Sequence, residues 1–186
     1  MVTIRTERPA DQAAREALLD VAYGDIRHTK PSAKLRRGRL PAEGLALVAF
    51  EHGKMLGTIR LWNVSAGGCD ALLLGPLAVH PDARSRGIGA ALMKRALGEA
   101  TRRGHGAVIL VGDDAYYGRF GFSAAKTGAL HLATACDPAR LLACELKAGA
   151  LDGARGLIAA TGRRIPKPSR VDRPAAGSPQ PVPRAA

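Results

Sequence analysis

Residues 75–97 read GPLAVHPDARSRGIGAALMKRAL, and they decide which fold the chain can adopt. The apolar run at residues 72–79 predicts a strand that ends at His80-Pro81, because proline lacks the N–H that a sheet requires and keeps the preceding residue out of helical geometry. After a polar loop, apolar residues recur at every fourth position and predict one buried face of a helix that begins near Gly87. These residues are Ile88, Leu92, Ala96 and Ala100.

The start of this helix lacks the acidic residues that usually accompany a helix N-terminus. Residues 87–92 contain neither Asp nor Glu, and Arg84 and Arg86 come just before them. Unpaired backbone N–H groups, closely spaced glycines and nearby arginines together favour binding of an anion such as a pyrophosphate. The glycine pair Gly87 and Gly89 alone would fit a tight turn equally well.

The whole pattern resembles the acetyl-CoA motif of the GNAT N-acetyltransferase superfamily, in which Arg or Gln is followed by two residues, Gly, one residue, and Gly or Ala. Residues 84–89, RSRGIG, match this motif at every position. Residues 116–122, YYGRFGF, are similar to a second hallmark of the small bacterial N-acetyltransferases in this superfamily. The resemblance covers residues 1–158.

The resemblance implies an α/β (α+β) fold, in which a mixed, mostly antiparallel sheet is flanked by helices and contains a central βαβ unit that binds acetyl-CoA. It also implies an enzyme, an acyltransferase that moves an acetyl group from the CoA thioester directly to a primary amine of a small molecule or peptide. Acetyl-CoA is then the co-substrate, with its pantetheine arm along the strand and its pyrophosphate on the glycine loop. The residues implied to bind it are Leu77, Ala78, Val79, Arg84, Arg86, Gly87, Ile88, Gly89 and Ala90.

Tyr117 is the candidate catalytic residue, as the general acid for the departing CoA thiolate. A phenol has a reference pKa of about 10 and a thiol one of about 8.5, so the tyrosine is protonated at neutral pH and can donate a proton once the thiolate forms. Tyr116 is expected to pack instead. No acid occurs in residues 71–79 to deprotonate the amine. Asp113, Glu51, a water relay and an acceptor that is already partly neutral are the alternatives.

Much of the formal net charge of +12 comes from two basic segments. Residues 27–39 hold six basic side chains and no acid, and they fall where members of the family line the acceptor entrance. Residues 161–186 hold six basic side chains against one acid, together with six of the twelve prolines. This composition predicts a single N-acetyltransferase domain at residues 1–160 and a basic, disordered tail at residues 161–186.

A non-catalytic module is the alternative function, one that binds acyl-CoA, or nucleic acid through the basic segment and tail. The intact motif around Tyr117 favours the enzyme, and no aromatic RNA-binding signature accompanies the basic residues, which argues against nucleic acid as a partner. A dinucleotide-binding oxidoreductase does not fit, because residues 80–86 intervene where its tight turn is needed and the third glycine of its motif is absent.

Composition limits the remaining classes. Three widely spaced cysteines indicate neither a disulfide framework nor a metal site. No apolar run approaches the length of a membrane span, and the start MVTIRTER lacks the apolar core of a signal peptide, so a cytoplasmic protein without membrane association is expected. Whether it forms a homodimer stays open, as does the identity of the amine.

The rest of the chain predicts further elements around the central unit, from apolar periodicity and from turn residues such as His52-Gly53. They are a strand at residues 2–5, a helix from Pro9 to Gly24, a helical turn at 32–37, a hairpin of strands 45–51 and 54–64, a strand at 107–111, a short helix at 115–119, and strands from Phe122 onward and at 141–146.

Overall fold

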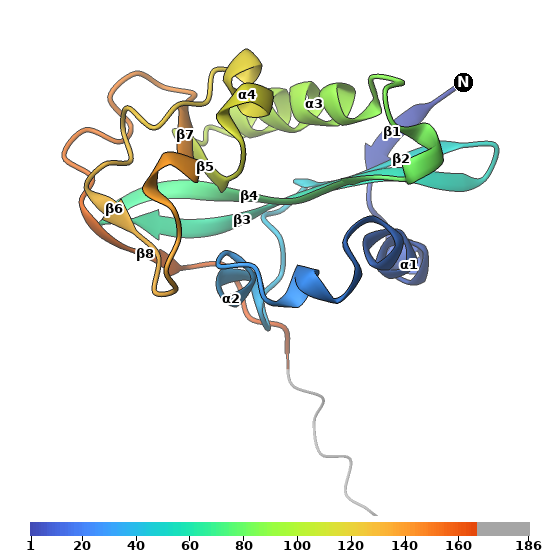
Figure 1. Cartoon of the computed structure of the whole chain (residues 1–186), viewed down its shortest axis with the longest axis horizontal. Helices are drawn as coiled ribbons and strands as arrows, with labels where there is room; N and C mark the ends of the chain where they lie inside the picture. The colour runs from blue at the N-terminus through green and yellow to red at the C-terminus, as the bar shows by residue number, and fades with distance from the viewer. Residues whose placement is uncertain (167–186) are drawn as a thin grey trace, which may run out of the picture.

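The computed structural model describes residues 1–166 of the chain, in which an eight-stranded sheet has helices on both faces (Figure 1). The strands are β1 (Thr3–Thr6), β2 (Ala46–Glu51), β3 (Lys54–Ala66), β4 (Cys69–Val79), β5 (Ala107–Val111), β6 (Leu130–His131), β7 (Leu141–Glu145) and β8 (Gly156–Ala160). Their order is β1-β2-β3-β4-β5-β7, with β8 beside β3 and β6. Only the pairs β4–β5 and β6–β8 are parallel. The predicted mixed, mostly antiparallel α/β fold is confirmed.

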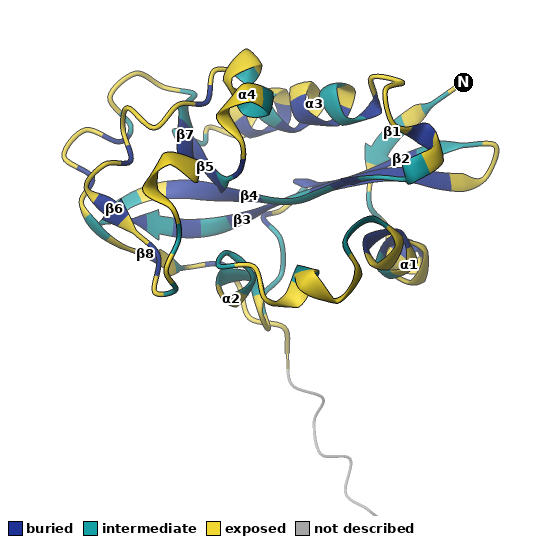
Figure 2. Ribbon diagram, viewed as in Figure 1, coloured by how far each residue is buried: buried dark blue, intermediate teal, exposed yellow. Residues whose placement is uncertain are grey.

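Helices cover the sheet from both sides. Helix α3 (Ile88–Arg102) and the short α4 (Asp114–Tyr117) lie on one face, and α1 (Gln12–Tyr23) and α2 (Ala33–Arg36) lie on the other (Figure 1). The four apolar residues predicted to form the buried face of α3 are each at most 3% exposed. Figure 2 shows buried positions along the central strands and on the sides of α1 and α3 that face them. None of these helices is long and apolar enough to cross a membrane within residues 1–166.

Strand β4 separates from its neighbour β5 after a short paired stretch. The two strands pair over residues 72–73 of β4 and 108–109 of β5, whereas β4 continues to Val79. The register of β4 against β3 shifts at Gly75-Pro76, where Pro76 has no N–H to donate and the strand bulges. Beyond this bulge, one edge of β4 has no strand partner within residues 1–166, and the sheet opens there.

The chain after Phe122 does not form the predicted strand. Phe122 is buried, but only an isolated bridge between Ser123 and Ala143 joins this segment to β7. The Thr127 hydroxyl donates to the Leu141 carbonyl at 2.6 Å and holds the segment in a turn rather than a ladder. The prediction of a strand from Phe122 onward is wrong, and β6 and β8 are additions that the sequence did not predict.

The folded domain continues past residue 160, where the sequence placed its end. The Leu40 N–H donates to the Arg163 carbonyl at 2.8 Å, and the Ile165 N–H donates to the Gly38 carbonyl at 2.9 Å. Residues 163–165 therefore pair with the segment that follows α2, and the first part of the predicted tail belongs to the domain. The rest of the predicted disordered tail, residues 167–186, lies outside the described residues.

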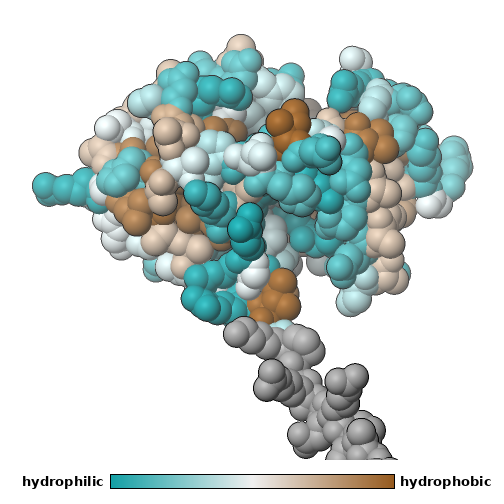
Figure 3. Space-filling view, turned by 60° about the horizontal axis from the view of Figure 1, so that its bottom comes forward, coloured by the Kyte–Doolittle hydropathy of each residue, from teal (hydrophilic) through white to brown (hydrophobic). Residues whose placement is uncertain are grey.

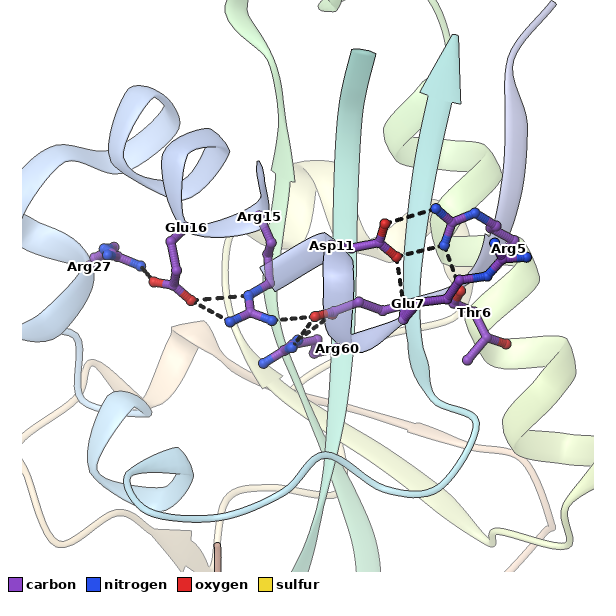
Figure 4. Close-up of polar contacts among 9 residues, drawn as sticks. Arg5, Thr6, Glu7, Asp11, Arg15, Glu16, Arg27 and Arg60 are labelled. Atoms are coloured by element: carbon purple, nitrogen blue, oxygen red, sulfur yellow. Dashed lines mark hydrogen bonds and ion pairs between the residues drawn. The ribbon is translucent and has the colours of Figure 1, made fainter. Parts of the chain in front are cut away.

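A chain of ion pairs fixes α1 over the sheet (Figure 4). The carboxylate of Glu7, which is 6% exposed, accepts hydrogen bonds from Arg15 of α1 and from Arg60 of β3, the latter between Nε and Oε2 at 2.8 Å. Arg15 also bonds to Glu16 at 2.5 Å, and Glu16 in turn pairs with Arg27 at 2.5 Å. Glu7 thus pairs with two arginines at once and connects a helix to the strand beneath it.

We expect Glu7→Gln to lower the free energy of unfolding by about 3 kcal/mol, because it leaves buried cations without their counter-charge. Urea denaturation of the wild type and the variant measures this loss. Glu43→Gln is the matched control, since Glu43 is exposed and has no ion pair among the described residues; it should change stability by less than about 0.5 kcal/mol. Equal effects of the two substitutions would contradict the structural role of Glu7.

Candidate active site

A hollow of about 460 Å³ lies where β4 leads into α3. Six of the residues predicted to bind the cofactor line it, namely Val79, Arg84, Gly87, Ile88, Gly89 and Ala90. The first turn of α3 contains no acidic residue, so nothing there competes for its N–H groups, which have no partners within the helix. The hollow has the chemical character of an anion site.

Two glycines give the hollow its shape. Gly87 begins α3 with a φ of +77°, in the left-handed region that side chains disfavour. A methyl group on Gly89 would lie 2.8 Å from the hydroxyl of Tyr116. Arg119 also lines the hollow, with its guanidinium 4.3 Å from the centre of the Tyr116 ring. The sequence did not predict these two residues here, because only folding brings the segment after β5 over the start of α3.

Arg86, also predicted to bind the cofactor, does not line this hollow. Its Nη2 donates to both carboxylate oxygens of Glu51, at 2.8 and 2.9 Å. This hydrogen bond is the main cause that lowers the pKa of Glu51. The alternative base Glu51 is therefore engaged at the end of β2, and it does not line the cavity described below.

The unpaired edge of β4 presents two of the three predicted strand residues. The His80 N–H donates to the Leu56 carbonyl of β3 at 2.8 Å, and Ala78 lies opposite Thr58 of the same strand. Because backbone groups alternate in direction along a strand, those of Leu77 and Val79 face away from β3, toward the opening. Ala78, in contrast, turns its backbone groups to β3, so the geometry does not support its predicted contact with a ligand.

A second cavity, of about 320 Å³, lies between strands β3 and β4 and the segment from α1 to α2. Leu77 lines this cavity whereas Val79 lines the first hollow, so the open edge of β4 runs from one to the other. Tyr117 lines the second cavity, and its neighbour Tyr116 lines the first. Figure 3 shows the face that carries α1 and α2, where many hydrophilic side chains gather.

The second cavity is strongly basic. Among the described residues, Glu16 is the one carboxylate that lines it, against the cations Arg15, Arg27, Lys30, Arg36, Arg37 and Arg60. Burial lowers the pKa of the Arg36 guanidinium to about 10. Burial, followed by the charges of Arg36 and Arg140, also lowers the pKa of the Lys30 ammonium. The cavity thus disfavours additional positive charge and attracts negative charge.

Tyr117 stands at the end of α4, a helix that Asp113 caps. The Asp113 carboxylate accepts a hydrogen bond from the Ala115 N–H at 3.1 Å, so this alternative base has a structural role and does not line the cavity. The Tyr117 ring packs edge-on against Tyr116 and Phe122, with ring centres 4.9 and 6.0 Å away. Burial is the main cause that raises the pKa of Tyr117 above its ordinary value, so the hydroxyl remains protonated at neutral pH.

Tyr23 is a further residue of the cavity, which the sequence did not single out. Its hydroxyl donates to the Leu77 carbonyl, and the Lys30 ammonium lies 3.8 Å from the centre of its ring. Burial raises the pKa of Tyr23 as well. A tyrosine at the end of a helix carries no local signal of such a role, because the contact with β4 depends on how α1 packs on the sheet.

Comparison with known proteins agrees with this geometry. A family model described as an acetyltransferase (GNAT) domain matches residues 42–124, which include both sequence motifs. The crystal structure of the GNAT family N-acetyltransferase YhbS from Escherichia coli in complex with CoA is 29% identical, covers 86% of this chain and 89% of its own, and superposes with a TM-score of 0.73. In sequence and in fold the chain is similar to the GNAT N-acetyltransferases.

Further relatives extend this likeness. The curated sequence of YhbS from Escherichia coli K12, described as an uncharacterised N-acetyltransferase, is 29% identical over 157 residues, which are 83% of this chain and 93% of the relative. A GNAT family acetyltransferase from Brucella melitensis, crystallised with acetyl-CoA, is 29% identical, covers 77% of this chain and 95% of its own, and has a TM-score of 0.58. The predicted family and the predicted acyltransferase class are confirmed.

The raised pKa of Tyr117 gives a spectroscopic prediction. Because burial raises its pKa above the ordinary value of 10, Tyr117 should not contribute to the tyrosinate absorbance that develops as the folded protein is titrated to pH 10. Tyr117→Phe should therefore leave this absorbance unchanged in the folded protein, yet reduce it in concentrated urea, where the phenol is exposed. A loss of absorbance in the folded state below pH 10 would show that the hydroxyl is accessible to solvent.

Proposed function

We propose that the protein transfers an acetyl group from acetyl-CoA to a primary amine, with Tyr117 as the general acid for the departing thiolate. The observation that carries this proposal is the open edge of β4, which joins an anion-binding hollow to a basic cavity at Tyr117. The crystallised relatives, one with CoA and one with acetyl-CoA, support acetyl-CoA as the co-substrate.

The residues present fit such a co-substrate. The pyrophosphate would lie on the N–H groups of Gly87 to Ala90, beside Arg84 and Arg119, where the lack of a side chain on Gly89 leaves room. The pantetheine arm would add to the edge of β4 at the Leu77 N–H and the backbone of Val79, as an extra strand would, while the Leu77 carbonyl stays bonded to Tyr23. Ala78 would contribute indirectly, since its bonds to β3 hold that edge straight. Arg86 has no part in this arrangement.

Acetyl transfer also requires stabilisation of the negative charge that develops on the thioester oxygen. The N–H of Leu77 faces the opening of the sheet, and Leu77 lines the basic cavity. We therefore assign the stabilisation of this oxyanion to the Leu77 N–H. The hydrogen bond from Tyr23 to the Leu77 carbonyl holds this stretch of backbone in place. Tyr117 then donates its proton to the sulfur as the thiolate departs.

The charges and the burial of the basic cavity indicate how the acceptor amine loses its proton. Glu16, its one described carboxylate, is held by Arg15 and Arg27, and its pKa is lowered in spite of its burial, so it is a weak base. The cavity instead disfavours an ammonium ion, because burial and, after it, the charges of Arg36 and Arg140 lower the pKa of Lys30. We therefore infer that the acceptor reacts as an amine that its environment has already shifted toward the neutral form.

The catalytic role of Tyr117 is tested by Tyr117→Phe, which removes one oxygen and keeps the packed ring. A positioned acid contributes about 100- to 10,000-fold, so kcat should fall by about that factor while acetyl-CoA still binds. Steady-state release of the CoA thiol measures kcat. Tyr116→Phe is the control on the adjacent ring and should reduce kcat by less than about tenfold. A near-normal kcat for Tyr117→Phe would show that the thiolate takes its proton from water.

The cofactor site is tested by thermal unfolding with acetyl-CoA. At about a hundred times its Kd, acetyl-CoA should stabilise the fold by about 2.7 kcal/mol. Gly89→Asp should abolish this stabilisation, because it places a carboxylate and its bulk where the pyrophosphate binds. Gly98→Asp is the matched control in the same helix, where the glycine is exposed and a Cβ meets no atom within 4 Å. The assignment fails if acetyl-CoA stabilises both variants equally.

A further inference from the structure

We propose that the acceptor amine carries a carboxylate or phosphate group, and that Arg36 and Lys30 bind this anion in the basic cavity. The inference rests on the proposed acetyl transfer and names the chemical class of its acceptor. We base this inference on the ion pairs of the basic side chains in the cavity. Some of these side chains pair with a carboxylate of the domain, whereas others have no such partner among the described residues.

Three arginines in the cavity wall are neutralised by carboxylates of the domain itself. The pairs are Arg15 with Glu7 and Glu16, Arg27 with Glu16 and Asp20, and Arg60 with Glu7. These interactions hold α1 to the sheet, and they leave little charge on those arginines for a ligand.

Arg36 of α2 is different, because it has no ion-pair partner within residues 1–166. Its Nε donates to the Ser32 carbonyl at 3.3 Å, and the rest of its guanidinium faces the cavity that it lines. Arg36 is half-buried, and partial removal of an unpaired charge from water is costly, which is why burial lowers its pKa to about 10. A bound anion would remove the penalty, whereas a neutral acceptor would leave it in place.

Lys30 would hold the anion close to the edge of β4 where we place the thioester. Its ammonium lies 3.8 Å from the centre of the Tyr23 ring, and the hydroxyl of that ring bonds to Leu77. Arg36 is also near enough to Tyr23 for its positive charge to lower the tyrosine's pKa against the effect of burial. An anion bound by Arg36 and Lys30 would therefore lie beside Tyr23, close to the strand edge where we place the thioester.

The size and charge of the cavity narrow the acceptor further. Its volume of about 320 Å³ is near the lower end of the range for ligand pockets, which span about 300–1,000 Å³, so a small molecule fits better than a folded protein. A guanidinium binds two oxygens of a carboxylate or phosphate at once. A polyamine, in contrast, would add positive charge to a wall that is already cationic. Amino carboxylates and aminoalkyl phosphates are the two classes of amine that are small enough for the cavity and also carry an anionic group.

Anion binding can be measured without any acetyl transfer, because the chain's single tryptophan, Trp62, lines the same cavity. We would titrate the full-length protein with butyrate, with methyl phosphate and with the neutral amide butyramide, and follow tryptophan emission. Butyrate or methyl phosphate should change the emission saturably, and butyramide should not. Whichever of butyrate and methyl phosphate binds with the lower Kd identifies the acid group that the acceptor carries.

Variants of α2 test which basic side chain binds the anion. A hydrogen bond to a charged group is worth enough that Arg36→Gln should weaken anion binding about tenfold or more. Lys34→Gln removes the same charge from the same helix, but Lys34 is exposed and does not line the cavity, so its effect should stay below about twofold. Arg36→Lys should restore part of the affinity, and unchanged melting temperatures would show that the variants are folded. Equal effects of Arg36→Gln and Lys34→Gln would overturn the proposal.

Turnover separates this inference from the proposed function. With acetyl-CoA present, 4-aminobutyrate or 3-aminopropyl phosphate should exceed 4-aminobutyramide in kcat/KM by about tenfold or more, and Arg36→Gln should remove that preference mainly through KM. Acetylation of all three amines at equal efficiency, with no emission change on adding butyrate or methyl phosphate, refutes the anion site and leaves the transferase intact. Saturable anion binding with no acetylation of any amine refutes the transferase and leaves the anion site.

Discussion

The site depends on a strand that stops pairing. β4 bonds to β5 over residues 72–73 and then diverges at the Gly75-Pro76 bulge. On that side, no strand of the described part of the chain pairs with Leu77 and Val79. Buried backbone groups require partners, and an unpaired strand edge is a natural template for an extended molecule. The divergence that removes hydrogen bonds from the sheet therefore creates the edge along which we place the pantetheine arm. α3 begins at one end of this edge, and Tyr117 stands at the other.

Cations near this opening differ according to whether the fold neutralises them. Glu7 pairs with both Arg15 and Arg60, and Glu16 also pairs with Arg15, so these side chains connect α1, the preceding loop and β3. Arg36 has no such acid among the described residues, and it projects from a helix of only four residues at the rim of the domain. The rigid wall and the charge available to a ligand thus come from different elements. Such a division would allow the recognition of the acceptor to change in α2 without loosening the sheet.

Features that occupy one contiguous stretch of the chain could be predicted from the sequence, whereas features that depend on packing between distant segments could not. The glycine loop, α3 and β5 each occupy one contiguous stretch, so composition and periodicity were enough to place them. β8 reads GLIAA and pairs with β3, far away in the chain, and so short a run without alternation carries no signal of its own. Arg119 and Tyr23 enter the site through folding alone. Ala78 shows a different limit, because the family resemblance names the strand but only the observed register tells which backbone groups face the opening.

Two tyrosines reach the cavity, and their hydrogen bonds distinguish them. The hydroxyl of Tyr23 donates its proton to the Leu77 carbonyl, so that proton is engaged in holding β4. Within residues 1–166 the hydroxyl of Tyr117 has no hydrogen-bond partner, which leaves its proton available to a group bound in the opening. Burial raises the pKa of both, and more strongly that of Tyr117, so acidity alone does not favour Tyr117. A phenol whose pKa lies well above that of a thiol also regains its proton from water after each transfer. Availability of the proton, rather than ease of ionisation, therefore favours Tyr117 as the acid and Tyr23 as a positioning residue.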